Sequence, residues 1–338
     1  MMTDNEAFSA TTEAERAGLA IAGGATTTDL VGLDSLVEQA RQFASGSKAP
    51  ATRRAYRSDW RQFTTWCVTH GLPSMPATPA AVATYITSMA SQGKKVATIS
   101  RALVSISQAH AMARYESPTS AAVVRETAKG IRRALGTHQT QKAPVMPQQL
   151  KAMLGDMPDD LLAVRNRAML LLGFAGGFRR SELTALDVRD VEFTDGGLII
   201  KLKKSKTDQE AQGRSVGIPY GSTHQSCPVR SVKAWLAAAS ITSGPVFRAV
   251  GRWGHVAAKR LDGRAVARAV QAGAGNLGLD AKRYGGHSLR AGLATSAARA
   301  GKSERAIMAQ TGHRSEAMVR RYIRAGSLFS DNAAAGLL

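Results

Sequence analysis

The sequence predicts a mainly α-helical protein with a small antiparallel β-sheet, organised as two domains. Apolar residues recur every three or four positions through most of 31–136 and again from 148 onward, which is the spacing of amphipathic helices. The polar stretch 137–147 has two prolines and no periodicity, so we expect a linker there. The period changes within 191–220, where apolar segments flank turn residues and predict the sheet. A chain of 338 residues is long enough for two such domains.

The first domain is expected to be helical throughout. Residues 1–30 hold five acidic residues against one basic and lack an apolar period, so we expect a flexible acidic tail before the domain of 31–136. Thr52 is a candidate N-cap for one helix, and Thr78, with Pro79 at the first helical position, for the next. The expected helices are 29–44, 52–71, 78–93, 94–116 and 120–136.

The second domain, 148–325, is expected to place its sheet among helices. Its first two helices end at a Gly-Gly break, Gly176 and Gly177. An Asp-Gly-Gly turn within 191–220 separates two strands, and a polar tip precedes a further strand. The expected helices are 148–157, 160–177, 180–186, 227–240 and 263–278, followed by those within 285–323. Residues 326–338 form a C-terminal tail with an apolar tip.

Charge and composition limit the classes of partner. Lys and Arg number 45 against 25 Asp and Glu, a net charge of +20. Such an excess indicates a polyanionic partner, nucleic acid first and an anionic membrane surface second. Two cysteines, Cys67 and Cys227, are too few for a disulfide framework, and an intracellular setting is expected. There is no apolar run of membrane-spanning length and no secretory signal at the N-terminus, so no membrane association is expected.

One stretch, 285–323, carries polar residues at regular intervals. His287 and Arg290 are three apart and share a helix face, His313 follows a Thr-Gly pair, and Tyr322 comes nine residues later among several arginines. Taken singly, each has an ordinary alternative: a surface histidine, a solvated arginine, or a half-buried tyrosine whose hydroxyl finds a partner. Together they are plausible for a site that handles a phosphate.

Upstream residues can complete such a site. Arg179 follows the Gly-Gly-Phe break and begins a helix in which Glu182, three residues later, can orient its guanidinium or merely pair with it at the surface. Lys206 lies in the lysine-rich tip of the predicted hairpin, where it is either solvated or able to reach DNA. The AGKS of 300–303 lacks the first glycine of a phosphate-binding loop, because Ser296 stands there. No zinc-binding spacing occurs, so neither a metal nor another cofactor is expected.

In this order, GFRRSEL, a hairpin lysine, HSLR, TGH and a tyrosine nine residues on resemble the tyrosine recombinase (phage integrase) family, over nearly the whole chain. Within it the chain looks most like the Cre recombinase branch. The resemblance implies a two-domain DNA clamp, with a helical core-binding (SAM-like) domain joined by a linker to the catalytic domain. His313 departs from Cre, which has tryptophan there, and agrees with most of the family.

The resemblance implies roles for the matched residues. Arg179 and Arg290 grip the scissile phosphate, and Tyr322 is the nucleophile that forms a 3′-phosphotyrosine. Lys206 protonates the leaving 5′ oxygen, although Lys203 and Lys204 are close enough in sequence to leave this assignment open. The remaining matches are His287, His313 and the supporting acid Glu182, with either histidine open as the general base.

Physical chemistry agrees with these roles. Two guanidiniums present planar donors to the non-bridging phosphate oxygens and bind them more strongly as negative charge builds up. A tyrosine has a pKa of about 10 and is a poor nucleophile at neutral pH unless cations or a base help to remove its proton. The ester conserves the bond energy, so the reaction requires neither metal nor ATP.

The first domain is expected to hold double-stranded DNA, mainly through phosphate contacts. The family implies a homotetramer acting on an inverted-repeat site in two duplexes, in the cytoplasm at the nucleoid, with the C-terminal tail either exchanged between subunits or frayed. Alternatives are a type IB-like topoisomerase or telomere resolvase with the same chemistry, and a non-catalytic DNA-binding regulator. The basic residues expected at DNA are Arg53, Arg54, Arg57, Lys94, Lys95, Arg101, Arg132 and Arg133, of which Lys95 and Arg101 are expected nearest the groove.

Overall fold

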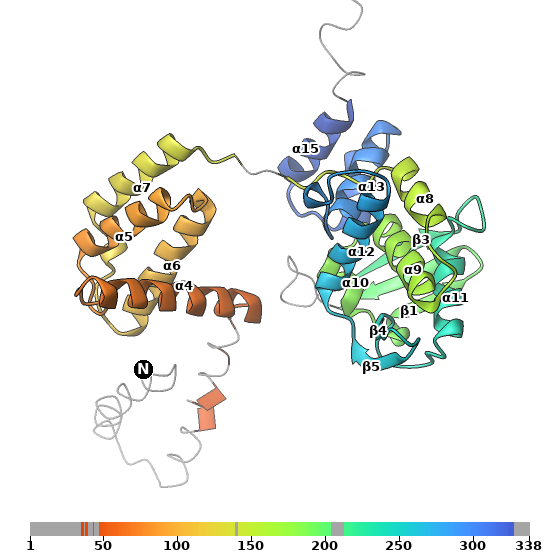
Figure 1. Ribbon diagram of the computed structural model, residues 1–338, viewed down its shortest axis with the longest axis horizontal. Coiled ribbons are helices and arrows are strands. Elements are labelled where there is room, and N and C mark those ends of the chain that lie inside the picture. The colour runs from red at the N-terminus through yellow and green to blue at the C-terminus, as the bar shows by residue number, and fades with distance from the viewer. Residues whose placement is uncertain are drawn as a thin grey trace, which may run out of the picture. The chain divides into compact units, whose positions relative to one another are not determined.

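Helices make up most of the computed structural model, which describes residues 47–138, 141–203 and 213–327 and a few isolated positions between 35 and 43. The chain divides into two units, Met1–Gln139 and Thr140–Leu338 (Figure 1). The predicted acidic tail, most of the first predicted helix, the hairpin tip with Lys206 and the tail beyond Ser327 lie outside the described residues.

Unit 1 is helical in its described part, as predicted. Phe63, Ile86 and Ile106, from three different helices, are completely buried at its centre. The elements are α4 (Pro50–Thr69), α5 (Pro79–Ser91), α6 (Val96–Met112), the 3₁₀ turn η1 (Pro118–Ser120) and α7 (Ala122–Leu135).

The two predicted helix starts in unit 1 have different outcomes. Thr78 is confirmed as the N-cap of α5, because its side chain accepts a hydrogen bond from the backbone N–H of Ala81 and Pro79 follows it. Thr52 as an N-cap is wrong. The helix begins two residues earlier at Pro50, since the fixed φ of proline suits the first helical turn, and Thr52 lies inside α4.

Unit 2 surrounds a three-stranded antiparallel sheet of order β1-β2-β3 with helices, which confirms the predicted fold class. A two-stranded sheet, β4-β5, is additional to the prediction. The elements are α8 (Pro147–Gly155), α9 (Leu161–Ala175), α10 (Arg180–Ala185), η2 (Val188–Asp190), β1 (Val191–Thr194), β2 (Gly197–Leu202), β3 (Arg214–Pro219), α11 (Pro228–Ala238), β4 (Arg248–Val250), β5 (Val256–Arg260), α12 (Gly263–Asn276), η3 (Ala281–Arg283), α13 (Ser288–Arg299), α14 (Glu304–Thr311) and α15 (Glu316–Ser327).

The predicted Asp-Gly-Gly turn joins β1 to β2. Gly197 has a φ of 143°, and a Cβ there would lie 2.1 Å from the carbonyl oxygen of Ile218 on β3. Only glycine fits so close to the neighbouring strand. The turn therefore sets the register in which Gly197 faces Pro219.

Part of the predicted linker packs against unit 2. The N–H of Ala143 donates to the carbonyl of Arg283, and the N–H of Val145 donates to the carbonyl of Ser288. Val145 is completely buried, and a Cβ on Gly292 of α13 would lie 1.9 Å from its carbonyl oxygen. The segment leading into α8 thus lies directly on the helix that carries Arg290.

Two apolar clusters position the end of the chain. The main one contains Phe178, Trp235 and Leu289, and a smaller one joins α13, α14 and α15 through Ala294, Ile307 and other buried residues. The smaller cluster also contains Tyr322, so the same packing that folds α15 back onto α13 fixes this side chain. None of the described helices is both long and apolar enough to cross a membrane.

Candidate active site

The Gly-Gly break positions Arg179. After α9 ends, Gly177 adopts a φ of 57°, where a Cβ would lie 2.8 Å from the side chain of Leu293. Phe178 is buried in the main core, and Arg179 follows as the N-cap residue of α10. A tight turn and a buried aromatic anchor therefore direct the arginine to the edge of the core.

Glu182 binds both the backbone and the side chain of Arg179. Its Oε2 accepts the backbone N–H of Arg179 at 2.9 Å, and its Oε1 lies 2.5 Å from Nη1 of the guanidinium. Because the Glu182 side chain is almost completely buried, these contacts replace the hydrogen bonds that water would otherwise make to it. Of the two alternatives left open by the sequence, the structure favours an orienting carboxylate over a surface pair.

Arg290 is buried, in contrast to the solvated alternative. Its Nη1 donates to the carbonyls of Gly177, at 2.8 Å, and of Thr311. Its Nη2 is buried without a hydrogen-bond partner. Burial, together with the nearby Arg179, lowers the pKa of Arg290 to about 10, so the group remains charged at pH 7. An unpartnered charged donor in a buried position is suited to an anionic ligand.

Tyr322 reaches the same site from α15. Its hydroxyl lies 2.9 Å from Nε2 of His287, which immediately precedes α13. Burial raises the pKa of Tyr322, and the charges of Arg290, Arg321 and Arg179 oppose this rise. Desolvation, followed by the charges of Arg290 and Arg179, lowers the pKa of His287. At neutral pH the ring is therefore neutral, and it can accept the tyrosine proton.

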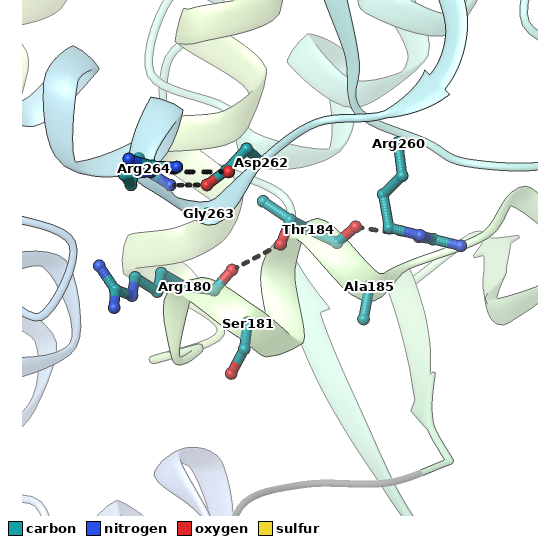
Figure 2. A pocket seen from close by; sticks show the side chains of 8 residues that line it. All are labelled: Arg180, Ser181, Thr184, Ala185, Arg260, Asp262, Gly263 and Arg264. Carbon is teal, nitrogen blue, oxygen red and sulfur yellow. Dashed lines mark hydrogen bonds and ion pairs between the residues drawn. The ribbon is translucent and has the colours of Figure 1, made fainter. Parts of the chain in front are cut away.

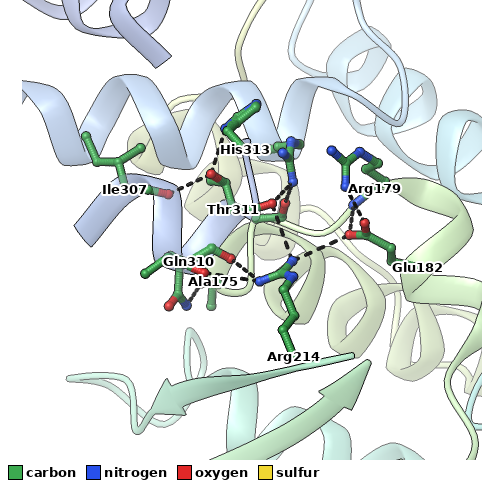
Figure 3. Close-up of polar contacts among 11 residues, drawn as sticks. Ala175, Arg179, Glu182, Arg214, Ile307, Gln310, Thr311 and His313 are labelled. Carbon is green, nitrogen blue, oxygen red and sulfur yellow. Dashed lines mark hydrogen bonds and ion pairs between the residues drawn. The ribbon is translucent and has the colours of Figure 1, made fainter. Parts of the chain in front are cut away.

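His313 lies in the loop between α14 and α15. Its Nδ1 is 2.7 Å from Oγ1 of Thr311, and that oxygen is 2.6 Å from the carbonyl of Ile307 (Figure 3). A carbonyl can only accept, so the single hydroxyl proton of Thr311 is directed to Ile307, and His313 donates from Nδ1. In the neutral ring the lone pair is then on Nε2. Burial, followed by Arg290 and other nearby cations, lowers the pKa of His313 to about 3.

The charge of this site is unbalanced. The positive charges of Arg179 and Arg214 both contribute to the lowered pKa of Arg290. Glu182 is the carboxylate that pairs with Arg179 and with Arg214. Such a cluster attracts an anion the size of a phosphate. Among the described residues, no group of three or more His, Cys, Asp or Glu side chains is gathered as around a metal ion.

The structure thus brings five of the six predicted catalytic residues and Glu182 to one site. They come from the start of α10, the start and interior of α13, the loop before α15, and α15 itself. The sixth, Lys206, lies outside the described residues. Lys203, one of the alternatives for it, pairs with Asp190 at 2.8 Å.

The predicted DNA-binding residues of unit 1 are exposed but are not equivalent. Arg101 donates through Nε and Nη2 to both carboxylate oxygens of Asp59, at 2.6 and 2.9 Å, and so ties α6 to α4. The prediction of Arg101 as a groove-facing residue missed this structural partner. The others lie on the surface of α4, at the start of α6 and near the end of α7: Arg53, Arg54, Arg57, Lys94, Lys95, Arg132 and Arg133.

A basic hollow of about 410 Å³ adjoins the site along α10 (Figure 2). Arg180, Arg260 and Arg264 line it together with the acidic Asp262. Arg260 is held by the carbonyls of Thr184 and Leu186, at 2.9 and 3.1 Å, and by an ion pair to Asp187. Arg180 directly follows Arg179, so the hollow extends the positive surface away from the catalytic cluster.

Sequence reasoning missed two residues of the site, Arg214 and Thr311. Arg214 begins β3 and contacts Glu182 and the end of α14, and the hydroxyl of Thr311 holds His313. The Thr-Gly pair before His313 was a usable signal for Thr311. No local pattern marks Arg214, because an arginine after a hairpin tip is ordinarily solvated.

Comparisons with known proteins show the family of the chain. The sequence profile of the phage integrase family matches residues 145–327. The integrase/recombinase xerD homolog of Selenomonas ruminantium is 40% identical over 300 residues, covering 87% of each protein. The recombinase cre of Escherichia phage P1 is 24% identical over 289 residues, covering 78% of this chain and 81% of that protein. Sequence identity is thus higher with the xerD homolog than with Cre.

The fold is also similar to that of a solved structure. A post-cleavage complex of the XerH site-specific recombinase bound to palindromic difH substrate aligns with a TM-score of 0.57 at 18% identity, over 77% of this chain and 72% of that one. Both the sequence profile, matched over more than half of the chain, and the relative at 40% identity lead to one conclusion. The chain belongs to the phage integrase family, the tyrosine-type site-specific DNA recombinases.

Proposed function

We propose that Tyr322 attacks a DNA phosphodiester and that the chain rejoins the cut strand to a different one. The observation that carries this proposal is the 2.9 Å contact between the hydroxyl of Tyr322 and Nε2 of His287, beside the guanidiniums of Arg179 and Arg290. A nucleophile, a neutral base and two cations for the phosphate are the parts that such a reaction needs.

The cleavage step balances with these groups. The hydroxyl oxygen of Tyr322 bonds to phosphorus while His287 takes its proton, and the bond from phosphorus to the 5′ oxygen breaks. Arg179 and Arg290 donate to the non-bridging oxygens, where negative charge increases in the transition state. The departing 5′ oxygen takes a proton from Lys206, so the products are a 3′-phosphotyrosine and a 5′ hydroxyl. Attack by a 5′ hydroxyl from another strand reverses the step.

His287 is the better candidate for the general base. Its Nε2 is within hydrogen-bond distance of Tyr322, whereas the ring centroid of His313 is 5.7 Å from that of Tyr322 and its Nδ1 is taken up by Thr311. His313 can donate to a phosphate oxygen from Nε2 only in its protonated form, because the lone pair of the neutral ring is on that atom. Lys206 is proposed as the acid for the 5′ oxygen on the basis of the family resemblance.

DNA binding is proposed to use the exposed cations of unit 1 and the basic hollow beside α10. Most of these contacts would be to phosphates, because arginine and lysine bind them without regard to sequence. A homotetramer on two copies of an inverted repeat is proposed from the family resemblance, since exchange between duplexes requires more than one active site.

The test begins with the DNA site. Purified full-length chain selects its repeat from a pool of random duplex DNA, and that repeat is then built as a nicked duplex that traps the covalent adduct. Wild type is expected to form an adduct that maps to Tyr322, and Tyr322→Phe is expected to bind the same duplex and form none. Wild-type adduct levels with Tyr322→Phe would refute the assignment.

A second assay separates strand exchange from topoisomerase chemistry. Exchange between two plasmids that carry the selected repeat, without relaxation of a plasmid that lacks it, is expected. Relaxation of the plasmid without the repeat, and no exchange, would favour the topoisomerase alternative.

A further inference from the structure

We propose that Arg214 is a positioning residue that sets the spacing between the two phosphate-binding guanidiniums and His313. The inference rests on the proposed function and assigns this arginine a part in the same reaction. Arg214 is the first residue of β3, and its side chain is mostly buried against α10 and α14.

The guanidinium of Arg214 holds the C-terminal end of α14. Its Nη1 donates to the carbonyls of Ala309 and Gln310, at 3.2 and 3.0 Å, and its Nη2 donates to the carbonyl of Thr311 at 3.3 Å (Figure 3). The last carbonyls of a helix lack intrahelical partners and carry partial negative charge. Arg214 supplies both the hydrogen bonds and the positive charge for this end, from which the loop with His313 begins.

Arg214 also shares the supports of both clamping arginines. Its Nη2 lies 3.7 Å from Oε2 of Glu182, the carboxylate that holds Arg179. The Thr311 carbonyl that it contacts also accepts a hydrogen bond from Arg290. The guanidinium of Arg214 therefore contacts both Glu182, which holds Arg179, and the Thr311 carbonyl, which holds Arg290. A change in the position of this guanidinium alters the distance between Arg179 and Arg290.

The loop is shaped around this guanidinium. Gly312 has a φ of 66°, and a Cβ there would lie 2.7 Å from Nε of Arg214 and 2.9 Å from Cζ. Glycine thus meets two requirements at once: a left-handed turn after α14 and space for the arginine. Next to it, Gln310 donates to the carbonyls of Ala175 and Gly217, at 2.8 and 3.2 Å, and ties the same helix end to α9 and β3.

A lysine cannot replace Arg214 in this position. The planar guanidinium reaches three carbonyls and a carboxylate at the same time, whereas an ammonium is a single point on a flexible chain. Arg214→Lys therefore preserves the charge but loosens the geometry. A displacement of the order of 1 Å at reacting groups costs about 100-fold in rate, and we expect the smaller shift here to cost about tenfold.

The test uses three versions of the nicked duplex selected above. One has an ordinary scissile phosphate, and two have sulfur in place of either non-bridging oxygen. The ratio of cleavage rates between the oxygen and sulfur substrates reports how the guanidiniums fit each oxygen. A lower fraction of folded enzyme slows all three substrates equally and leaves these ratios unchanged.

Arg214→Lys and Gly312→Ala are expected to change at least one ratio by about threefold or more while leaving duplex affinity within about twofold. The matched control is Arg165→Lys. Arg165 is also a buried arginine of unit 2, but it donates to Asn166 and to the carbonyl of Arg248, and the charge that affects its pKa is that of Arg268. None of these partners belongs to the candidate active site. Its ratios are expected to equal those of wild type.

Two outcomes would contradict the inference in different ways. If Arg214→Lys slows all three substrates by one common factor while wild type forms its Tyr322 adduct, Arg214 only supports the fold. If wild type forms no such adduct, the proposed function fails and the inference fails with it.

Discussion

Each unit contains an arginine paired with a buried carboxylate, and the two pairs have opposite consequences. In unit 1, Asp59 is 4% exposed and Arg101 is 47% exposed, and two hydrogen bonds match one cation to one anion. In unit 2, Glu182 is 1% exposed and Arg179 is 17% exposed, and the same carboxylate also faces Arg214. The first pair is balanced and joins two helices, whereas the second leaves a buried positive excess.

The difference suggests how the role of an arginine can be inferred from its partners. A guanidinium whose charge is matched and whose donors are used has a structural role, as in the contact between α4 and α6. A guanidinium such as that of Arg290, with a buried Nη2 that lacks a partner, lies beside other cations and has binding capacity left over. That remaining capacity at a terminal guanidinium nitrogen, rather than burial itself, indicates a site for an anion. The buried Nε of Arg214 also lacks a partner, but Gly312 lies against it, where a Cβ would be 2.7 Å away.

The largest expected effect is on the rate of adduct formation, which we expect to differ strongly between variants of Arg290 and Arg101. Arg290→Ala is expected to reduce the rate of adduct formation by about 1,000-fold or more, because it removes charge stabilisation in the transition state. Arg101→Ala is expected to leave the rate constant for adduct formation on saturating DNA within about threefold. Rates measured on the nicked duplex, together with duplex affinity by fluorescence anisotropy, check both expectations.

A strong loss of duplex affinity with Arg290→Ala would contradict this comparison, since the arginine would then act mainly in binding. The same variant still folded but cleaving at the wild-type rate would remove Arg290 from the chemistry.

The second prediction compares how much Glu182 contributes to the stability of unit 2 with how much Asp59 contributes to the stability of unit 1. Glu182→Gln leaves a cluster of cations without its counter-charge, and we expect it to lower the free energy of unfolding of unit 2 by about 3 kcal/mol. Asp59→Asn is expected to cost unit 1 only about 1 kcal/mol, because water partly solvates Arg101 once its partner is neutral. Denaturant unfolding can follow each unit through its own tryptophans, Trp60 and Trp66 in unit 1 and Trp235 and Trp253 in unit 2.

Added sulfate or inorganic phosphate sharpens this second test. Either anion is expected to stabilise unit 2 of Glu182→Gln more than it stabilises unit 1 of Asp59→Asn. Equal stabilisation of both would indicate that the cluster in unit 2 has no special affinity for anions.

The third prediction concerns the pH dependence of the stability of unit 2. The pKa of His313 is lowered from 6.5 to about 3 in the folded protein, so the unfolded chain binds the extra proton first as the pH falls. The contribution to stability is complete above pH 6.5 and is lost between about 6.5 and 3, with a slope of up to about 1.4 kcal/mol per pH unit.

His313→Asn, which cannot titrate, is the matched variant for this prediction. The difference in unfolding free energy between wild type and His313→Asn is expected to change in favour of the variant as the pH falls from 6.5 to 4. Parallel pH profiles for the two proteins would contradict the lowered pKa.

Local sequence patterns were sufficient to predict most of the helices. The apolar period of three to four residues predicted the helices of unit 1, and Thr78 with Pro79 predicted the start of α5. Thr52 misled, because a proline two residues earlier started the helix first. The β4 and β5 strands are short and mostly exposed, so no alternation of apolar residues marked them.

The sequence by itself predicted most residues of the candidate active site, because their types and order along the chain match the family, but it did not point to Arg214 or Thr311. Only the tertiary structure decided how they act on one another. It buried Arg290, placed His287 rather than His313 against the hydroxyl of Tyr322, and brought Arg214 to Glu182 and the end of α14. The physical reason is that burial and the balance of charge depend on contacts between residues that are far apart in the sequence. A local sequence pattern does not contain this information.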